Sequence, residues 1–187
     1  MKPALRVAGS ILTAVLFTAC ADTGQEAGDA DQLPPANADA PAAPAANQQE
    51  TSPDTTAAAL WAFLEEEAYR DNWQLWPGKD RLYTGTEPHG MLLTTYTNRT
   101  AYDALMAGQV ADLPAGSIIV KENWMPDSTY DAATVMYKVD GYNPDHQDWL
   151  FAKFNAAGAP DAFGRAPMCQ ACHAGAESGY VYTAVQR

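Results

Sequence analysis

The chain has 187 residues, with 23 Asp and Glu against 11 Lys and Arg, which gives a formal net charge of −12. So few cations cannot neutralise a phosphate backbone, which argues against a nucleic-acid binder. Of the 19 aromatic residues, 18 lie after position 55. The hydrophobic core is therefore expected within residues 56–187, a length that suits one compact domain and not two.

Residues 1–20 have the pattern of an export signal. Lys2 and Arg6 precede an uncharged run over residues 7–19, which is too short to span a bilayer as a mature helix. The run closes on Phe-Thr-Ala-Cys, which resembles a bacterial lipoprotein box in which Cys20 is lipidated and begins the mature chain. The alternative is ordinary cleavage after Ala21, which would remove Cys20. Both alternatives place the mature protein in the periplasm or at the cell surface, and the first predicts a lipid anchor in the membrane.

Residues 21–55 are predicted to be a disordered acidic tether. They contain ten Ala, five Pro, seven acidic residues, no basic residue and one large apolar residue, Leu33. Such a segment buries too little apolar surface to offset the entropy of ordering it. The remaining residues 56–187 hold 16 acidic and 9 basic residues, a net charge of −7. That charge predicts a site that prefers neutral or cationic small molecules over anions.

The domain over residues 56–187 is predicted to be α+β. A capping sequence at residues 52–55 precedes an Ala-rich amphipathic run, which predicts a helix over 56–70. Short runs rich in β-branched and aromatic residues predict strands over 91–97, 117–124, 134–139 and 149–154, with a short helix over 100–107. Turn clusters at 114–116, 141–144 and 158–160 favour tight returns, and hence a mainly antiparallel sheet with peripheral helices.

Residues 169–173 read Cys-Gln-Ala-Cys-His, the c-type haem attachment pattern. Two thiols three residues apart can add to the two haem vinyl groups, and the adjacent His173 is then the proximal iron ligand. The alternatives are a redox dithiol, which does not require the adjacent histidine, and a zinc half-site, which needs two more ligands when only His89 and His146 remain. The pattern therefore predicts one covalently attached haem c on Cys169 and Cys172. All three cysteines then have a predicted role, because Cys20 is the lipidation site and no cysteine is left for a disulfide.

The chain resembles the cytochrome P-460 family, which includes the cytochromes c′-β. The segments that carry the resemblance are residues 88–90, 96–98, 116–123, 135–144, 148–149, 169–173 and 179–181. The resemblance implies a largely antiparallel fold, a homodimer, and a five-coordinate haem whose distal side is open to small nitrogen-containing ligands such as hydroxylamine and nitric oxide.

Two further site residues follow from the resemblance. Lys121 matches the lysine that hydroxylamine-oxidising members crosslink to the haem, so we expect it beside the haem without a covalent bond. The alternative is a lysine whose amine reaches solvent. His89 falls where gas-binding members place a distal aromatic, and it is either a distal ligand or a turn histidine. We expect a turn at residues 88–90 that leaves the distal site open.

The sequence gives the remaining candidate site residues less specific roles. The family's enzymes rely on a distal carboxylate, which the alignment does not place within residues 137–140. His146 is predicted to be a solvated loop residue, and Met168 to have a packing role. Three functions stay open: a protein that binds or oxidises small nitrogen species, an electron carrier closed by His89 or Met91, and a tethered haem subunit that docks on a membrane redox complex.

Overall fold

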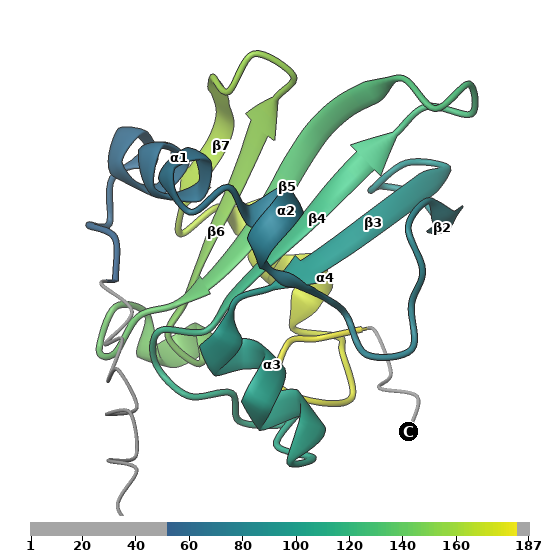
Figure 1. Ribbon diagram of the computed structural model, residues 1–187. Coiled ribbons are helices and arrows are strands. Elements are labelled where there is room, and N and C mark those ends of the chain that lie inside the picture. Colours follow the sequence, from purple (N-terminus) through teal and green to yellow (C-terminus); the bar gives the residue numbers. More distant parts are fainter. Residues whose placement is uncertain (1–51, 183–187) are drawn as a thin grey trace, which may run out of the picture. The chain divides into compact units, whose positions relative to one another are not determined.

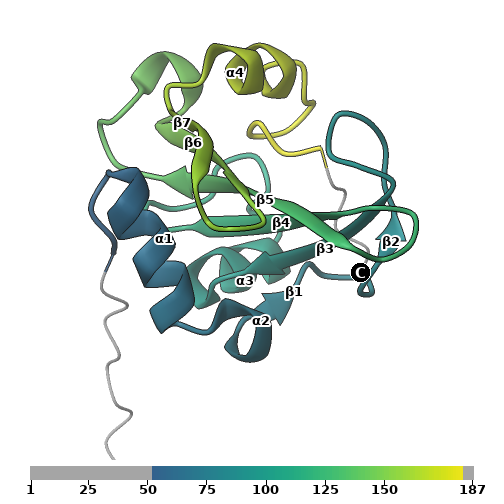
Figure 2. The ribbon, with the colours of Figure 1, turned by 90° about the horizontal axis from the view of Figure 1, so that it is seen from above.

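The computed structural model describes residues 52–182 and consists of one antiparallel sheet with helices on both faces (Figures 1 and 2). The helices are α1 (Ala57–Glu66), α2 (Tyr69–Asn72), α3 (Arg99–Met106) and α4 (Pro167–His173). The strands are β1 (Gln74–Leu75), β2 (Tyr83–Thr84), β3 (Leu92–Thr97), β4 (Ile118–Trp124), β5 (Tyr130–Lys138), β6 (Trp149–Asn155) and β7 (Pro160–Gly164). The predicted α+β class is confirmed.

The sheet follows the order of the chain from β3 onward. Its strand order is β1-β3-β4-β5-β6-β7, all pairs are antiparallel, and β2 also pairs with β3. Tight returns connect β4 to β5 and β6 to β7, while α3 lies in the connection between β3 and β4, as the sequence predicts. The predicted signal segment and nearly all of the tether lie outside the described residues, and Cys20 lies there too.

Each face of the sheet carries a hydrophobic core. On the face covered by α1 and α2, Leu60, Leu64 and Tyr69 pack against the strands. On the opposite face, the core includes Leu105 of α3 and Phe151 of β6, with Ala166 and Cys169 packed against it where the chain enters α4. Side chains alternate between the faces along a strand. The two cores therefore use alternate residues of the same strands.

Helix α1 is shorter than predicted. Thr56 is its N-cap, and the Thr56 side chain accepts a hydrogen bond from the N–H of Ala59. The helix ends at Glu66 and not at residue 70, because Ala68 has φ = 45°, a left-handed conformation that cannot continue an α-helix. The chain then restarts as α2, which directs Tyr69 into the core and Arg70 toward β4.

Two strand predictions also differ from the structure. Strand β5 begins at Tyr130, four residues before the predicted start, because its first residues pair with β4 and β6. Strand β7 was not predicted at all, and its first residue, Pro160, was assigned to a turn. Its ladder with β6, from Phe151 paired with Gly164 to Phe154 paired with Pro160, is a tertiary interaction that β7 itself does not signal.

Candidate functional site

Helix α4 carries the two cysteines of the attachment motif. Pro167 occupies its first turn, where the missing N–H costs no helical hydrogen bond. Cys169 and Cys172 are three residues apart, so they lie on neighbouring positions of one helical face. Both are free thiols, with Cys169 half-buried and Cys172 exposed. The helix therefore presents two unpaired sulfurs about one turn apart.

His173 ends the same helix and is buried, with 8% of its surface exposed. Its Nδ1 lies 2.7 Å from the carbonyl oxygen of Tyr180, and its ring packs against Phe151 with a centroid distance of 5.3 Å. Burial lowers the pKa of His173, partly offset by the hydrogen bond to Tyr180, with Lys121 lowering it further. The ring is thus held in one orientation as a neutral imidazole.

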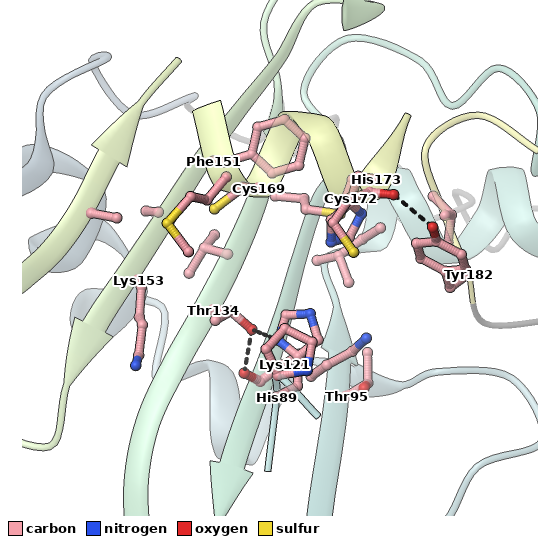
Figure 3. Close-up of a pocket in the computed structure, with 18 of the residues that line it drawn as sticks. His89, Thr95, Lys121, Thr134, Phe151, Lys153, Cys169, Cys172, His173 and Tyr182 are labelled. Atoms are coloured by element: carbon pink, nitrogen blue, oxygen red, sulfur yellow. Dashed lines mark hydrogen bonds between the residues drawn. The ribbon is translucent and has the colours of Figure 1, made fainter. Parts of the chain in front are cut away.

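Tyr182 encloses His173 from a third side. The two rings meet edge to face at 5.7 Å, and the Tyr182 hydroxyl donates a hydrogen bond of 2.6 Å to the carbonyl oxygen of Cys172 (Figure 3). This bond ties the chain after α4 back onto the last turn of the helix.

A pocket of about 280 Å³ separates α4 from the strand face below it (Figure 3). Its walls are mostly apolar, and both cysteines, His173 and Tyr182 line it from the α4 side. The apolar residues of the strand side include Ile119, Met136 and Phe151. Such walls exclude water and favour a large apolar ligand.

Lys121 lines this pocket from β4. Its neighbours Val120 and Glu122 are buried on the opposite face of the sheet, so the pleat turns Lys121 toward the pocket. Burial lowers the pKa of the Lys121 amine, which means that the surroundings disfavour its charge. The structure therefore brings Lys121 and the attachment motif to the same cavity.

His89 also lines the pocket, from the loop between β2 and β3. The loop forms the predicted turn, closed by the His89 N–H on the carbonyl oxygen of Thr86 at 3.2 Å. Two glycines shape it. Gly90 has φ = +102°, and a Cβ at Gly85 would meet the Gly90 carbonyl oxygen and the Leu93 side chain.

The turn directs the His89 side chain into the pocket and toward α4. The His89 and His173 rings have centroids 6.0 Å apart and planes inclined at 78°, and His89 Nδ1 lies 3.3 Å from Oγ1 of Thr134. Burial is the main cause that lowers the pKa of His89 to about 4, followed by the positive charge of Lys121 and by smaller electrostatic contributions from His173 and Lys153. His89 is thus a neutral imidazole at neutral pH.

The charge of the pocket differs from the prediction. None of the described residues that line the pocket is Asp or Glu, whereas two lysines, Lys121 and Lys153, line it. The acidic residues that give the domain its negative charge therefore lie outside the pocket. The residues that line the pocket give no basis for the expected preference for cations over anions. Asp140, within the stretch where a distal carboxylate was sought, is absent from the lining as well.

Two smaller predictions need correction. His146 lies at the end of a short 3-10 helix, Pro144–His146, and is not simply solvated, because its Nδ1 is 3.1 Å from the Tyr180 hydroxyl. Met168, which was predicted to have a packing role, lines the pocket from the first turn of α4 and is 87% exposed.

Sequence reasoning missed Thr134, Tyr180 and Tyr182. The positions that it did single out, His89, Lys121, Cys169, Cys172 and His173, all line one pocket, although they come from a loop, a strand and a C-terminal helix. Thr134, Tyr180 and Tyr182 contribute hydroxyl groups or a backbone carbonyl, and no sequence motif indicates such contacts.

The residues of the pocket define a class of protein. A helix with the Cys-X-X-Cys-His pattern, set over an apolar pocket, is an arrangement suited to a cytochrome. The family model of Cytochrome P460 matches residues 66–183, more than half of the chain and every candidate site residue except Cys20. The protein belongs to the cytochrome P460 family, and membership implies haem binding. No curated protein matches the chain.

Proposed function

We propose that the protein is an exported cytochrome that holds one haem c in this pocket, linked to Cys169 and Cys172 and ligated by His173. The observation that carries the proposal is the shared pocket. Two free thiols, a buried neutral imidazole and apolar walls all border it. These residues fit haem in chemistry, because thiols form the thioether bonds, imidazole ligates iron and the macrocycle is largely apolar.

Haem bound in this pocket would supply a redox-active iron. The chain's own residues prepare the site for it. Tyr180 fixes the His173 ring through Nδ1, and Phe151 and Tyr182 restrict its rotation. Lys153 also lines the pocket, and its positive charge suits the carboxylate groups of haem.

The second part of the proposal is that small nitrogen species such as hydroxylamine or nitric oxide bind on the strand side of the pocket. His89, Thr95 and Thr134 present polar groups there, opposite α4 (Figure 3). We favour binding over oxidation. The described lining contains no carboxylate that could accept protons from hydroxylamine, and His89 is the remaining candidate base.

Electron transfer is a second candidate function, alone or as a tethered subunit of a membrane redox complex. One observation favours it. Cys172 is exposed and Met168 is 87% exposed, so the attachment side of the pocket lies at the molecular surface. A redox protein could approach the haem from that side. The homodimer implied by the family resemblance remains part of the proposal.

Covalent attachment is tested by a Cys169→Ser, Cys172→Ser double variant, expressed with haem maturation factors. Thioether bonds survive denaturation and axial ligation does not, so haem should stay with the wild-type polypeptide on a denaturing gel and be absent from the variant. Intact mass should show one haem per wild-type chain. A matured wild-type protein without covalent haem would overturn the proposal.

A further inference from the structure

We infer that His89 is the second axial ligand of the haem iron, so that two imidazoles fill both axial positions in the resting protein. This inference rests on the proposed function, since it requires haem in the pocket. It goes beyond that proposal because it makes the binding of any small ligand depend on the release of His89.

The hydrogen bond of His173 fixes which of its nitrogens is free. Its Nδ1 is 2.7 Å from the carbonyl oxygen of Tyr180. A carbonyl oxygen can only accept, so Nδ1 must carry the proton. In a neutral imidazole the Nε2 of His173 is then unprotonated and has a lone pair available for a metal ion.

The same reasoning applies to His89 through two successive hydrogen bonds. The Thr134 hydroxyl donates its single proton to the carbonyl oxygen of Lys121 at 3.2 Å, and its Oγ1 lies 3.3 Å from Nδ1 of His89 (Figure 3). With that proton already used, Oγ1 can only accept from His89. His89 Nδ1 therefore carries the proton, and its Nε2 is the free ligand atom.

The spacing of the two rings suits a shared metal ion. Because a metal–imidazole bond is about 2 Å long, two imidazoles on opposite sides of one ion have ring centres roughly 6 Å apart. The centroids of His89 and His173 are 6.0 Å apart. Within residues 52–182, no hydrogen bond reaches the Nε2 of either ring. Two ligand atoms are thus left without a partner in one pocket.

Other donors in the pocket are less suited to this role. Met168 lines the pocket from the same helix as the cysteines and His173, so it lies on the α4 side and not on the strand side opposite His173. Lys121 must lose a proton before its amine can bind a metal ion, whereas the His89 tautomer is a ligand as it stands. Thr134 also orients the His89 ring through a hydrogen bond, and the structure gives no such contact to the Lys121 amine within the described residues.

A closed sixth position changes how the site would take up a ligand. An incoming molecule binds only to the fraction of protein from which His89 has dissociated, so the apparent affinity falls by that fraction. Association then reaches a limiting rate set by the release of His89.

The test uses the full chain matured with haem. Optical and paramagnetic resonance spectra of the wild type at neutral pH, without added ligand, should be low-spin. His89→Ala should be high-spin, and added imidazole should restore the low-spin spectrum. His146→Ala is the matched control and should stay low-spin, because the His146 side chain contacts the ring and hydroxyl of Tyr180 and not the Tyr180 carbonyl oxygen that binds His173.

The kinetics of ligand binding and the spectra of Thr134 variants provide two independent tests. Carbon monoxide should bind the reduced wild type at a rate that reaches a plateau with concentration, and His89→Ala at a linear rate that is about tenfold faster or more. Thr134→Val, which removes the oxygen that accepts from His89, should raise the high-spin fraction. Thr134→Ser keeps that oxygen and should not.

Three results would overturn the inference. A high-spin wild type that His89→Ala leaves unchanged shows haem without His89 ligation, and the proposed function survives. A low-spin spectrum that persists in His89→Ala assigns the sixth position to another donor such as Lys121. A matured protein without covalent haem removes the proposed function, and this inference with it.

Discussion

Glu122 lies next to Lys121 on β4 but points to the opposite face of the sheet, where its carboxylate is completely buried. Its Oε1 accepts hydrogen bonds from the Tyr69 hydroxyl at 2.9 Å and from Nε of Arg70 at 2.5 Å. The Arg70 guanidinium also lies over the Tyr130 ring at 4.9 Å. One partly exposed arginine therefore compensates a buried negative charge.

Arg70→Met should leave the Glu122 carboxylate buried without its cation. Removal of one partner from a fully buried ion pair costs about 3–5 kcal/mol, and we expect about 2 kcal/mol here because the Arg70 side chain is 41% exposed. Urea unfolding of the mature protein measures this change in the free energy of unfolding.

Arg99→Met is the matched control. Arg99 pairs with Asp103 at 2.6 Å, but both side chains are more than half exposed, so the expected loss is about 0.5 kcal/mol. Equal losses in the two variants would show that the Arg70–Glu122 pair contributes no more than a surface ion pair.

The site residues differ in how far the sequence reveals them. The two cysteines and His173 are found from spacing alone, because the chemistry of attachment fixes that spacing. The direction of His89 was not predictable, because it depends on the fit of Gly85 against Gly90 and on a hydroxyl from β5. Such contacts exist only after distant segments have met.

At the scale of elements, α1 packs against the sheet through Trp61. Its ring lies 4.9 Å from that of Phe154 on β6, and it covers the turn between β6 and β7. Gly158 in this turn has φ = +78°, and a Cβ there would overlap the Trp61 indole. The glycine is required both by the backbone conformation and by the close approach of the helix.

Gly158→Ala should therefore destabilise the protein through two causes. The left-handed conformation costs about 1–2 kcal/mol for a residue with a Cβ, and the overlap with Trp61 adds about 1–3 kcal/mol. The midpoint of thermal unfolding, together with tryptophan fluorescence, reports the loss and the displacement of the indole.

Gly141→Ala separates these causes. Gly141 has φ = +68°, but a Cβ there would meet nothing within 4 Å. This control should show only the conformational cost. If both variants lose the same stability, the close approach of Trp61 makes no energetic contribution.

The elements also show what sequence patterns can predict. Strands β3, β4 and β6 lie within one residue of their predicted bounds, because their apolar content is high enough to indicate a strand in isolation. Helix α1 was predicted four residues too long, since nothing in the Glu-rich sequence before Ala68 marks the left-handed residue. Strand β7 exists through pairing with β6, which a local pattern cannot reveal.

At the scale of the whole molecule, the proposed location depends on Cys20. None of the helices within residues 52–182 is both long and apolar enough to cross a bilayer. If Cys20 carries acyl chains, the mature protein should sediment with membranes, and Cys20→Ser should release it or block its processing. Fractionation followed by intact mass measures both effects.

Cys20→Ser should leave haem attachment intact when the variant is still exported, since Cys169 and Cys172 supply both thioether bonds. That readout controls for loss of export. An unmodified mature chain that begins at Asp22 would show ordinary secretion and would remove the lipid anchor from the proposal.

The alternation of β4 has a consequence for how this protein can change over evolutionary time. Ile119 and Lys121 face the pocket, whereas Val120 and Glu122 face the core beneath α1 and α2. A substitution at an odd position alters the surroundings of the ligand and leaves the opposite core in place, and one at an even position does the reverse. A lineage can thus acquire new pocket chemistry through single replacements along one strand that leave the core beneath α1 and α2 unchanged.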